Sequence, residues 1–186
     1  MAADAAGVAR LRIEECGPEQ AAVVHRLTQA AFRAHASLDP PSSAGRETLE
    51  SVRADLASGG ALARLDGRPA GCLRFAVAGD HVHVRRVAVP PELQGRGIGS
   101  ALMAWVEAKA AARGLAEVTL GVRLALSGNL RLYRRLGYEE AGRSSHPGHD
   151  RPTWVLMRKR VTPPGAPRPP GGDGPARPPA ASTRGS

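Results

Sequence analysis

A glycine-rich segment in the middle of the chain constrains the fold most strongly. A short β-branched run, Val87 to Val89, ends at Pro90-Pro91, and the segment Gln94 to Gly99 (QGRGIG) then leads into an uninterrupted helix-forming sequence. This order predicts a strand, a tight turn and a helix N-terminus. The first N–H groups of such a helix have no partners within the helix, and together with the positive end of its dipole they form a binding site for an anion.

The composition of this turn favours a phosphate group as the anion. Gly95, Gly97 and Gly99 lack a Cβ and therefore let a phosphate approach the backbone closely. Arg96 adds a positive charge that can bond phosphate oxygens at two points. The spacing is neither the Rossmann G-x-G-x-x-G nor a P-loop, which requires a lysine that is absent here. A purely structural turn is the alternative.

A second motif lies about thirty residues later, in NLRLYRRLGY (129–138). Asn129 and Tyr133 are four positions apart, so a helix would present them on the same face. A phenol with a pKa near 10 stays protonated at neutral pH and can donate a proton to a leaving group. The alternative is that Tyr133 packs as a core aromatic residue on an amphipathic helix.

These two motifs resemble the signatures of the GCN5-related N-acetyltransferase (GNAT) family. The resemblance spans residues 8–160, although the specific motifs are confined to the fourth strand and the region as far as Gly137. It implies an α+β fold: a mixed, mostly antiparallel sheet of about seven strands flanked by helices on both faces. It also implies direct transfer of an acetyl group from acetyl-CoA to a primary amine in a ternary complex. A non-catalytic acyl-CoA-binding or regulatory module is the alternative function.

The resemblance also assigns roles to individual residues. Tyr133 would be the general acid that protonates the leaving thiolate. Backbone groups of Val87 and Val89 would pair with the pantetheine amides, and one of their N–H groups would polarise the thioester carbonyl. The full set of residues assigned to acetyl-CoA is Val87, Val89, Gln94, Gly95, Arg96, Gly97, Ile98, Gly99, Ser100 and Asn129. This binding mode requires the fourth and fifth strands to separate, and the shift of apolar phase at Arg85-Arg86 predicts a β-bulge there.

The general base is the least defined part of the site. In several members of the family a glutamate on the fourth strand has this role, and the aligned position holds His83. A histidine with a pKa near 6.5 can accept the proton, whereas an exposed or structural histidine is the alternative. His81, Glu47 and bulk water are further candidates.

A short loop near the C-terminal end of the folded region is rich in potential ligands. His146, His149 and Asp150 lie within five residues, which suggests a metal site. The Pro-Gly between the histidines and the lack of a distant third ligand argue against it, and we expect no metal. In the family this loop borders the acceptor site, so His146, His149 or Arg151 would line the substrate pocket; a solvated loop is the alternative.

Apolar periodicity and turn residues predict the remaining elements. Asp66-Gly67 between two apolar runs predicts a β-hairpin, and Ser127 is predicted to be a helix N-cap. Gly114 and Gly137 are predicted to end helices. The expected strands are 8–16, 61–65, 70–77, 81–89, 117–122, one from 138, and 153–160; the expected helices are 18–35, 46–57, one from 98 to Gly114 and one from 127 to Gly137.

Composition sets the limits of the folded domain. Of the 186 residues, 161–186 contain eight of the sixteen prolines and almost no large apolar side chains, so we predict a disordered tail there. Residues 1–7 are predicted to be flexible, which leaves 8–160 as one domain. The net charge of +9 would suit nucleic acid or an anionic small molecule such as coenzyme A. Because the basic residues are scattered and no nucleic-acid motif is present, a nucleic-acid partner is not expected.

Two further features concern chemistry and location. Cys16 and Cys72 have neither metal nor redox spacing, so we predict buried free thiols and no covalent enzyme intermediate. The sequence contains no apolar run of membrane-spanning length and no signal-peptide core, so we predict a cytoplasmic enzyme without a membrane partner. The acceptor is a small-molecule or peptide amine whose identity stays open, and a homodimer is compatible with the family.

Overall fold

The computed structural model describes residues 10–33, 35 and 37–162. The predicted flexible segment 1–7 and positions 163–186 of the predicted tail lie outside the described residues. The elements in chain order are β1 (Leu11–Cys16), η1 (Pro18–Gln20), α1 (Ala21–Arg33), η2 (Ser43–Arg46), α2 (Leu49–Leu56), β2 (Gly60–Leu65), β3 (Arg68–Ala78), β4 (His81–Ala88), η3 (Pro91–Leu93), α3 (Ile98–Ala112), β5 (Glu117–Arg123), α4 (Ser127–Arg135), β6 (Glu139–Ser144) and β7 (Trp154–Arg160).

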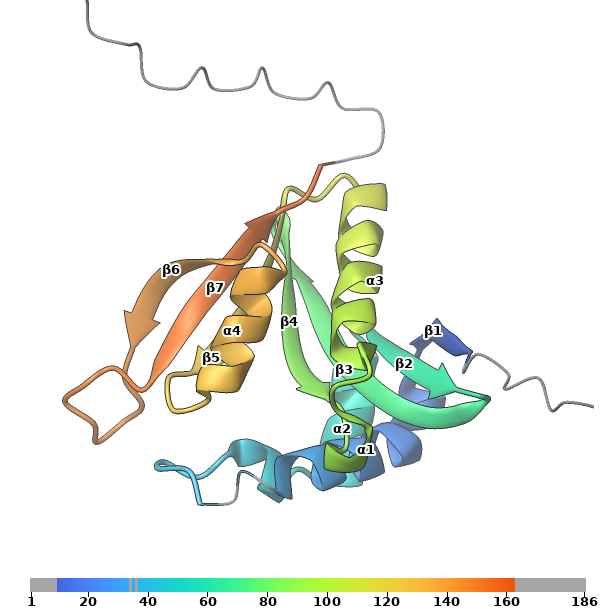
Figure 1. The fold of residues 1–186 in the computed structure, drawn as a ribbon, viewed down its shortest axis with the longest axis horizontal. Helices are drawn as coiled ribbons and strands as arrows, with labels where there is room; N and C mark the ends of the chain where they lie inside the picture. Colours follow the sequence, from blue (N-terminus) through green and yellow to red (C-terminus); the bar gives the residue numbers. More distant parts are fainter. Residues whose placement is uncertain (1–9, 34, 36, 163–186) are drawn as a thin grey trace, which may run out of the picture.

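These strands form one seven-stranded sheet with the order β1-β2-β3-β4-β5-β7-β6 (Figure 1). Every neighbouring pair is antiparallel except β4 and β5, which run parallel. The mixed, mostly antiparallel sheet confirms the predicted fold class. Within the described residues, no helix has the length and apolar character needed to cross a membrane.

Helices cover both faces of the sheet because its strands alternate between two apolar cores. In β2, Ala61 and Ala63 belong to one core and Leu62 belongs to the other. The first core is completed by α3 and α4, for example through Leu102. The second is completed by α1 and α2, for example through Val24.

The parallel pair β4–β5 opens at one end. Its ladder joins His81–Val84 to Glu117–Leu120 and then stops, although both strands continue. Just beyond this point Arg86 has a φ of 55°, and the register of β4 against β3 shifts. The β-bulge predicted at Arg85-Arg86 is therefore confirmed. It separates β4 from β5 and leaves that side of β4 without a ladder partner.

The predicted turns agree with the structure where glycine determines the conformation. Asp66 and Gly67 both have positive φ values, 51° and 77°, as a two-residue hairpin turn requires. Gly114 and Gly137 follow the ends of α3 and α4 with φ values of 71° and 86°.

One predicted helix start and one predicted N-cap were wrong. Helix α2 begins at Leu49 rather than at residue 46, because Thr48 and Ser51 exchange side-chain and backbone hydrogen bonds at 3.1 Å and cap the helix there. Ser127 is the first residue of α4 and not its N-cap; that position is occupied by Leu126, which makes no side-chain cap.

Candidate active site

The glycine turn presents the N-terminus of α3. Gly95 and Gly97 both have a φ of 77°, a conformation that glycine adopts without strain. Gly97 is the N-cap and offers no side chain, and the first turn of α3 contains no acidic residue. The N–H groups of Ile98, Gly99 and Ser100 have no acceptor within the helix. The end of α3 can therefore accept an anion.

A cavity of about 490 Å³, the first cavity, lies against this turn. Nine of the ten residues predicted to bind acetyl-CoA line it: Val87, Val89, Gln94, Gly95, Gly97, Ile98, Gly99, Ser100 and Asn129. The tenth, Arg96, is exposed and is not part of the lining. Contact between Arg96 and a phosphate therefore stays a prediction.

Two supporting contacts hold the turn in position. Gln94 donates from Nε2 to the carbonyl oxygen of Val89 at 3.0 Å, which ties the turn to the end of β4. Beneath it, a Cβ on Gly71 would lie 2.9 Å from Ile98 Cγ2 and 3.1 Å from the carbonyl oxygen of Ala88. Gly71 thus allows α3 to approach β3 closely. Sequence reasoning missed this residue, although an isolated glycine inside an apolar strand is a signal of such an approach.

A second cavity, also of about 490 Å³, is lined by residues of β4 and β5 and of the loops that precede α2 and β7. Four residues line both cavities: Phe32, Val87, Asn129 and Tyr133. The two cavities therefore meet where β4 has separated from β5 and where α4 passes over the gap.

Tyr133 is placed at this junction. Its side chain also belongs to the core: the residue is 6% exposed, and its ring meets that of Tyr138 edge-on at 5.8 Å. The two interpretations of Tyr133, core residue and cavity residue, are therefore compatible. Burial raises the pKa of Tyr133 above its usual value, so the phenol keeps its proton at neutral pH.

His83 lines the second cavity. Its Nδ1 lies 3.0 Å from Oγ1 of the buried Thr119, which faces it across the parallel β4–β5 ladder. Burial, and then the positive charge of Arg85 and the neighbouring His81, lower the pKa of His83. The imidazole is therefore neutral at pH 7. Its Nε2 can accept a proton if Nδ1 carries the hydrogen and donates it to Thr119.

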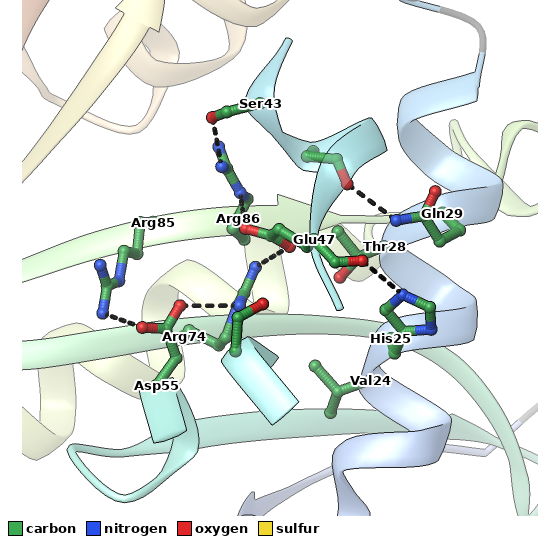
Figure 2. A network of polar contacts seen from close by, with 12 residues as sticks. Val24, His25, Thr28, Gln29, Ser43, Glu47, Asp55, Arg74, Arg85 and Arg86 are labelled. Carbon is green, nitrogen blue, oxygen red and sulfur yellow. Dashed lines mark hydrogen bonds and ion pairs between the residues drawn. The ribbon is translucent and has the colours of Figure 1, made fainter. Parts of the chain in front are cut away.

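The other two side chains considered as bases, Glu47 and His81, do not line either cavity. Both carboxylate oxygens of Glu47 are occupied: Oε1 accepts from Arg86 Nε at 2.7 Å and Oε2 from Arg74 Nη2 at 2.6 Å (Figure 2). His81 lies 3.5 Å from Asp80. Neither residue belongs to the lining of the two cavities.

The loop between β6 and β7 contributes two residues, His146 and Pro147, to the lining of the second cavity. His146 lines it, with Nε2 3.4 Å from Arg123 Nη1 and Nδ1 in contact with Thr153. His149 instead lies 3.6 Å from Asp39, and like Arg151 it is outside the lining. Across the described ranges, no three His, Cys, Asp or Glu side chains are grouped so that they could hold a metal ion.

Neither cysteine lines the two cavities. Cys16 and Cys72 are free and buried, as predicted. Burial raises the pKa of each to about 12, so neither forms a thiolate at neutral pH.

Comparison with known families decides the classification of this site. Residues 23–138 match the family described as "Acetyltransferase (GNAT) family". The chain belongs to this family. The match includes β4, the glycine turn, α3 and α4, so the GNAT segment contains most of the lining of the first cavity.

A curated GNAT relative is similar to part of the chain. The mycothiol acetyltransferase of Clavibacter michiganensis subsp. michiganensis is 42% identical over 76 residues, which are 41% of this chain and 25% of that protein. The chain thus matches about a quarter of the length of this relative.

Solved GNAT structures share the fold over most of the chain. The ribosomal-protein-S18-alanine N-acetyltransferase of Escherichia coli superposes with a TM-score of 0.68 at 21% identity, over 82% of this chain and 95% of that one. The PaiA N-acetyltransferase of Thermoplasma acidophilum, solved in complex with coenzyme A, gives a TM-score of 0.69 at 14% identity, over 82% and 99% of the two chains. At these low sequence identities, the similarity to the two structures shows a shared fold and nothing further.

Proposed function

We propose that this chain is an N-acetyltransferase that moves an acetyl group from acetyl-CoA to a primary amine by direct transfer. The observation that carries the proposal is the position of Tyr133 at the junction of the two cavities. An anion-accepting helix end borders one cavity, and His83 borders the other. Membership of the GNAT family and the similarity to a mycothiol acetyltransferase support the same reaction class.

The first cavity suits acetyl-CoA. Unpartnered N–H groups at the start of α3, without a competing acidic side chain, match a phosphate group. The side of β4 beyond Val84 lacks a ladder partner, so an amide-containing arm can pair with it as an additional strand would. The related Thermoplasma acidophilum protein was solved with coenzyme A bound, which is consistent with this donor.

Two side chains of the protein then transfer the two protons of the reaction. Acetyl-CoA supplies an activated acyl group: its C–S bond breaks as a C–N bond to the amine forms. His83 accepts the proton that the attacking amine loses, and Tyr133 donates a proton to the departing sulfur. The backbone N–H of Val87 or Val89 polarises the carbonyl. Proton exchange with solvent then restores both side chains.

The direct test is turnover of amines by the purified chain. Acetyl-CoA is incubated with a panel of primary amines, and released CoA thiol and acetylated product are measured by thiol titration and mass spectrometry. The proposal expects thiol and product in equal amounts with at least one amine. If coenzyme A binds tightly but no amine is acetylated, the chain is a non-catalytic acyl-CoA-binding module.

A further inference from the structure

The lining of the second cavity has an unbalanced charge. Four arginines, Arg46, Arg85, Arg86 and Arg123, line it together with His83 and His146. Within the part of the chain that the structure describes, the lining contains neither aspartate nor glutamate. The alternative is that carboxylates just behind the wall neutralise all of these charges.

Part of the charge is neutralised in a network beside the cavity. Arg74, Arg85 and Arg86 share the carboxylates of Glu47 and Asp55, at nitrogen–oxygen distances of 2.6–2.8 Å (Figure 2). Three guanidinium groups therefore face two carboxylates, and one positive charge stays in excess.

The other two arginines of the lining add to this excess. Arg46 is exposed, and neither Arg46 nor Arg123 makes an ion pair with any residue the structure describes. Arg123 is held by neutral acceptors instead: Nη2 donates to the carbonyl oxygen of Pro40 at 2.6 Å, and Nη1 lies 3.4 Å from His146 Nε2. Arg123 therefore places a fixed positive charge, without a carboxylate partner among the described residues, at the wall of the second cavity.

The same contacts join several elements around the second cavity. Through Arg123, strand β5 is joined to Pro40 in the loop before α2 and to His146 in the loop before β7. These two loops are thereby linked across the second cavity. Its volume of about 490 Å³ lies within the range of small-molecule sites.

We propose that the acceptor is a small primary amine that also carries an anionic group, a carboxylate or a phosphate, and that Arg46 and Arg123 bind this anion. This inference rests on the proposed function. A purely cationic amine, such as a polyamine, would be repelled by the excess of arginine charge. An anion in the same molecule offsets this repulsion. The same positive field favours the neutral form of the amine, which is the form that attacks the thioester.

Matched pairs of amines test the inference. Glycine, leucine, phenylalanine and glutamate are compared with their α-amides, and phosphoethanolamine is compared with ethanolamine; spermidine serves as the cationic probe. We expect kcat/KM to be about 10-fold or more higher for the member of the preferred pair that carries the anionic group, because a charge-assisted hydrogen bond is lost in the partner without that group. The pair that shows the effect distinguishes a carboxylate from a phosphate.

Two variants assign the effect to the proposed residues. Arg46→Gln and Arg123→Gln should each reduce the preference for the anionic amine by about 10-fold. The Arg46 side chain makes no hydrogen bond or ion pair with the residues that the structure describes, so its variant should fold normally. Arg53→Gln, which removes another exposed arginine outside both cavities, should leave the preference unchanged.

Several outcomes would overturn the inference. These are equal kcat/KM values within every pair, faster acetylation of spermidine or of peptide N-termini, or an undiminished preference in both cavity variants. Titration calorimetry in the presence of coenzyme A can compare the affinities of the N-acetylated acids with those of their amides, which tests the same preference without turnover. If the chain acetylates no amine but binds the N-acetylated acids more tightly than the amides, the proposed function is refuted. The anion-binding role of Arg46 and Arg123 is then still supported.

Discussion

Arg74 Nη2 lies 2.6 Å from Glu47 Oε2, and only 1% of the Arg74 side chain is exposed. Asp55 accepts from the other terminal nitrogen of Arg74 at 2.8 Å. Because Arg74 has almost no access to water, these two carboxylates provide the compensation for its charge. The contacts join β3 to α2 and to the segment that precedes α2 (Figure 2).

Glu47→Gln should therefore destabilise the protein strongly. The substitution leaves Arg74 with a single carboxylate and removes the carboxylate partner of Arg86, whose other bond goes to Ser43. Removal of one partner of a buried pair costs about 3 kcal/mol in the free energy of unfolding. Urea denaturation followed by circular dichroism measures this change.

An exposed pair provides the control. Glu14 bonds Arg64 at 2.6 Å, but 48% and 33% of their side chains are exposed. Glu14→Gln should lower the free energy of unfolding by less than about 1 kcal/mol, because water screens this pair. Equal losses in the two variants would show that burial of Arg74 does not determine the strength of its ion pairs.

Gly99→Ala should separate ligand binding from stability. A Cβ at this position would have only ordinary contacts, at 3.9 Å from Leu132 and 4.0 Å from Val89, so the fold can accept it. Because Gly99 lines the first cavity, the same methyl group would stand where a phosphate approaches the helix end. We expect an unchanged or slightly raised Tm and about a 10-fold weaker affinity for coenzyme A by calorimetry.

The matched control adds the same methyl group elsewhere. A Cβ on Gly142, in β6, would meet no atom within 4 Å, and this residue is outside both cavities. Gly142→Ala should keep wild-type affinity for coenzyme A. If Gly99→Ala also binds coenzyme A with wild-type affinity, the N-terminus of α3 is not part of the binding site.

Local rules were sufficient where a short segment determines its own conformation. The glycine turn, the Asp66-Gly67 hairpin and the bulge near Arg86 all followed from residue type and apolar phase. The start of α2 did not, because either Arg46 or Thr48 is compatible with the apolar pattern and only the exchange of bonds between Thr48 and Ser51 selects the second.

The site was harder to predict because its contacts are distant in sequence. His83 meets Thr119 through the register of two parallel strands, and nothing near either residue indicates this pairing. Arg74 follows Leu73 inside an apolar strand, so the sequence signals a buried arginine without identifying its partners. The second cavity is assembled from several loops and strands in the same way, which is why its charge emerged only from the structure.

Tyr133→Phe should lower kcat and leave binding intact. The variant removes one hydroxyl from a residue that otherwise packs in the core, so Tm and the Kd for coenzyme A should stay near the wild-type values. Loss of a general acid lowers kcat by about 100-fold or more. Because burial raises the pKa of Tyr133, the wild-type enzyme should show no loss of activity from ionisation of this residue up to pH 9. An unchanged kcat would eliminate Tyr133 as the proton donor.

His83 should produce the acidic limb of the pH profile. Burial and the charge of Arg85 lower the pKa of His83 below 6.5, so the imidazole is neutral at pH 7 and kcat should fall as the pH drops through this lower pKa. Arg85→Gln removes one cause of the shift and should move the limb to higher pH, whereas Arg113→Gln, on the exposed end of α3, should not. His83→Gln should lower kcat and abolish the limb. The test is to measure steady-state kcat between pH 5 and 9 for the wild type and the three variants. An intact acidic limb in His83→Gln would show that another group is the base.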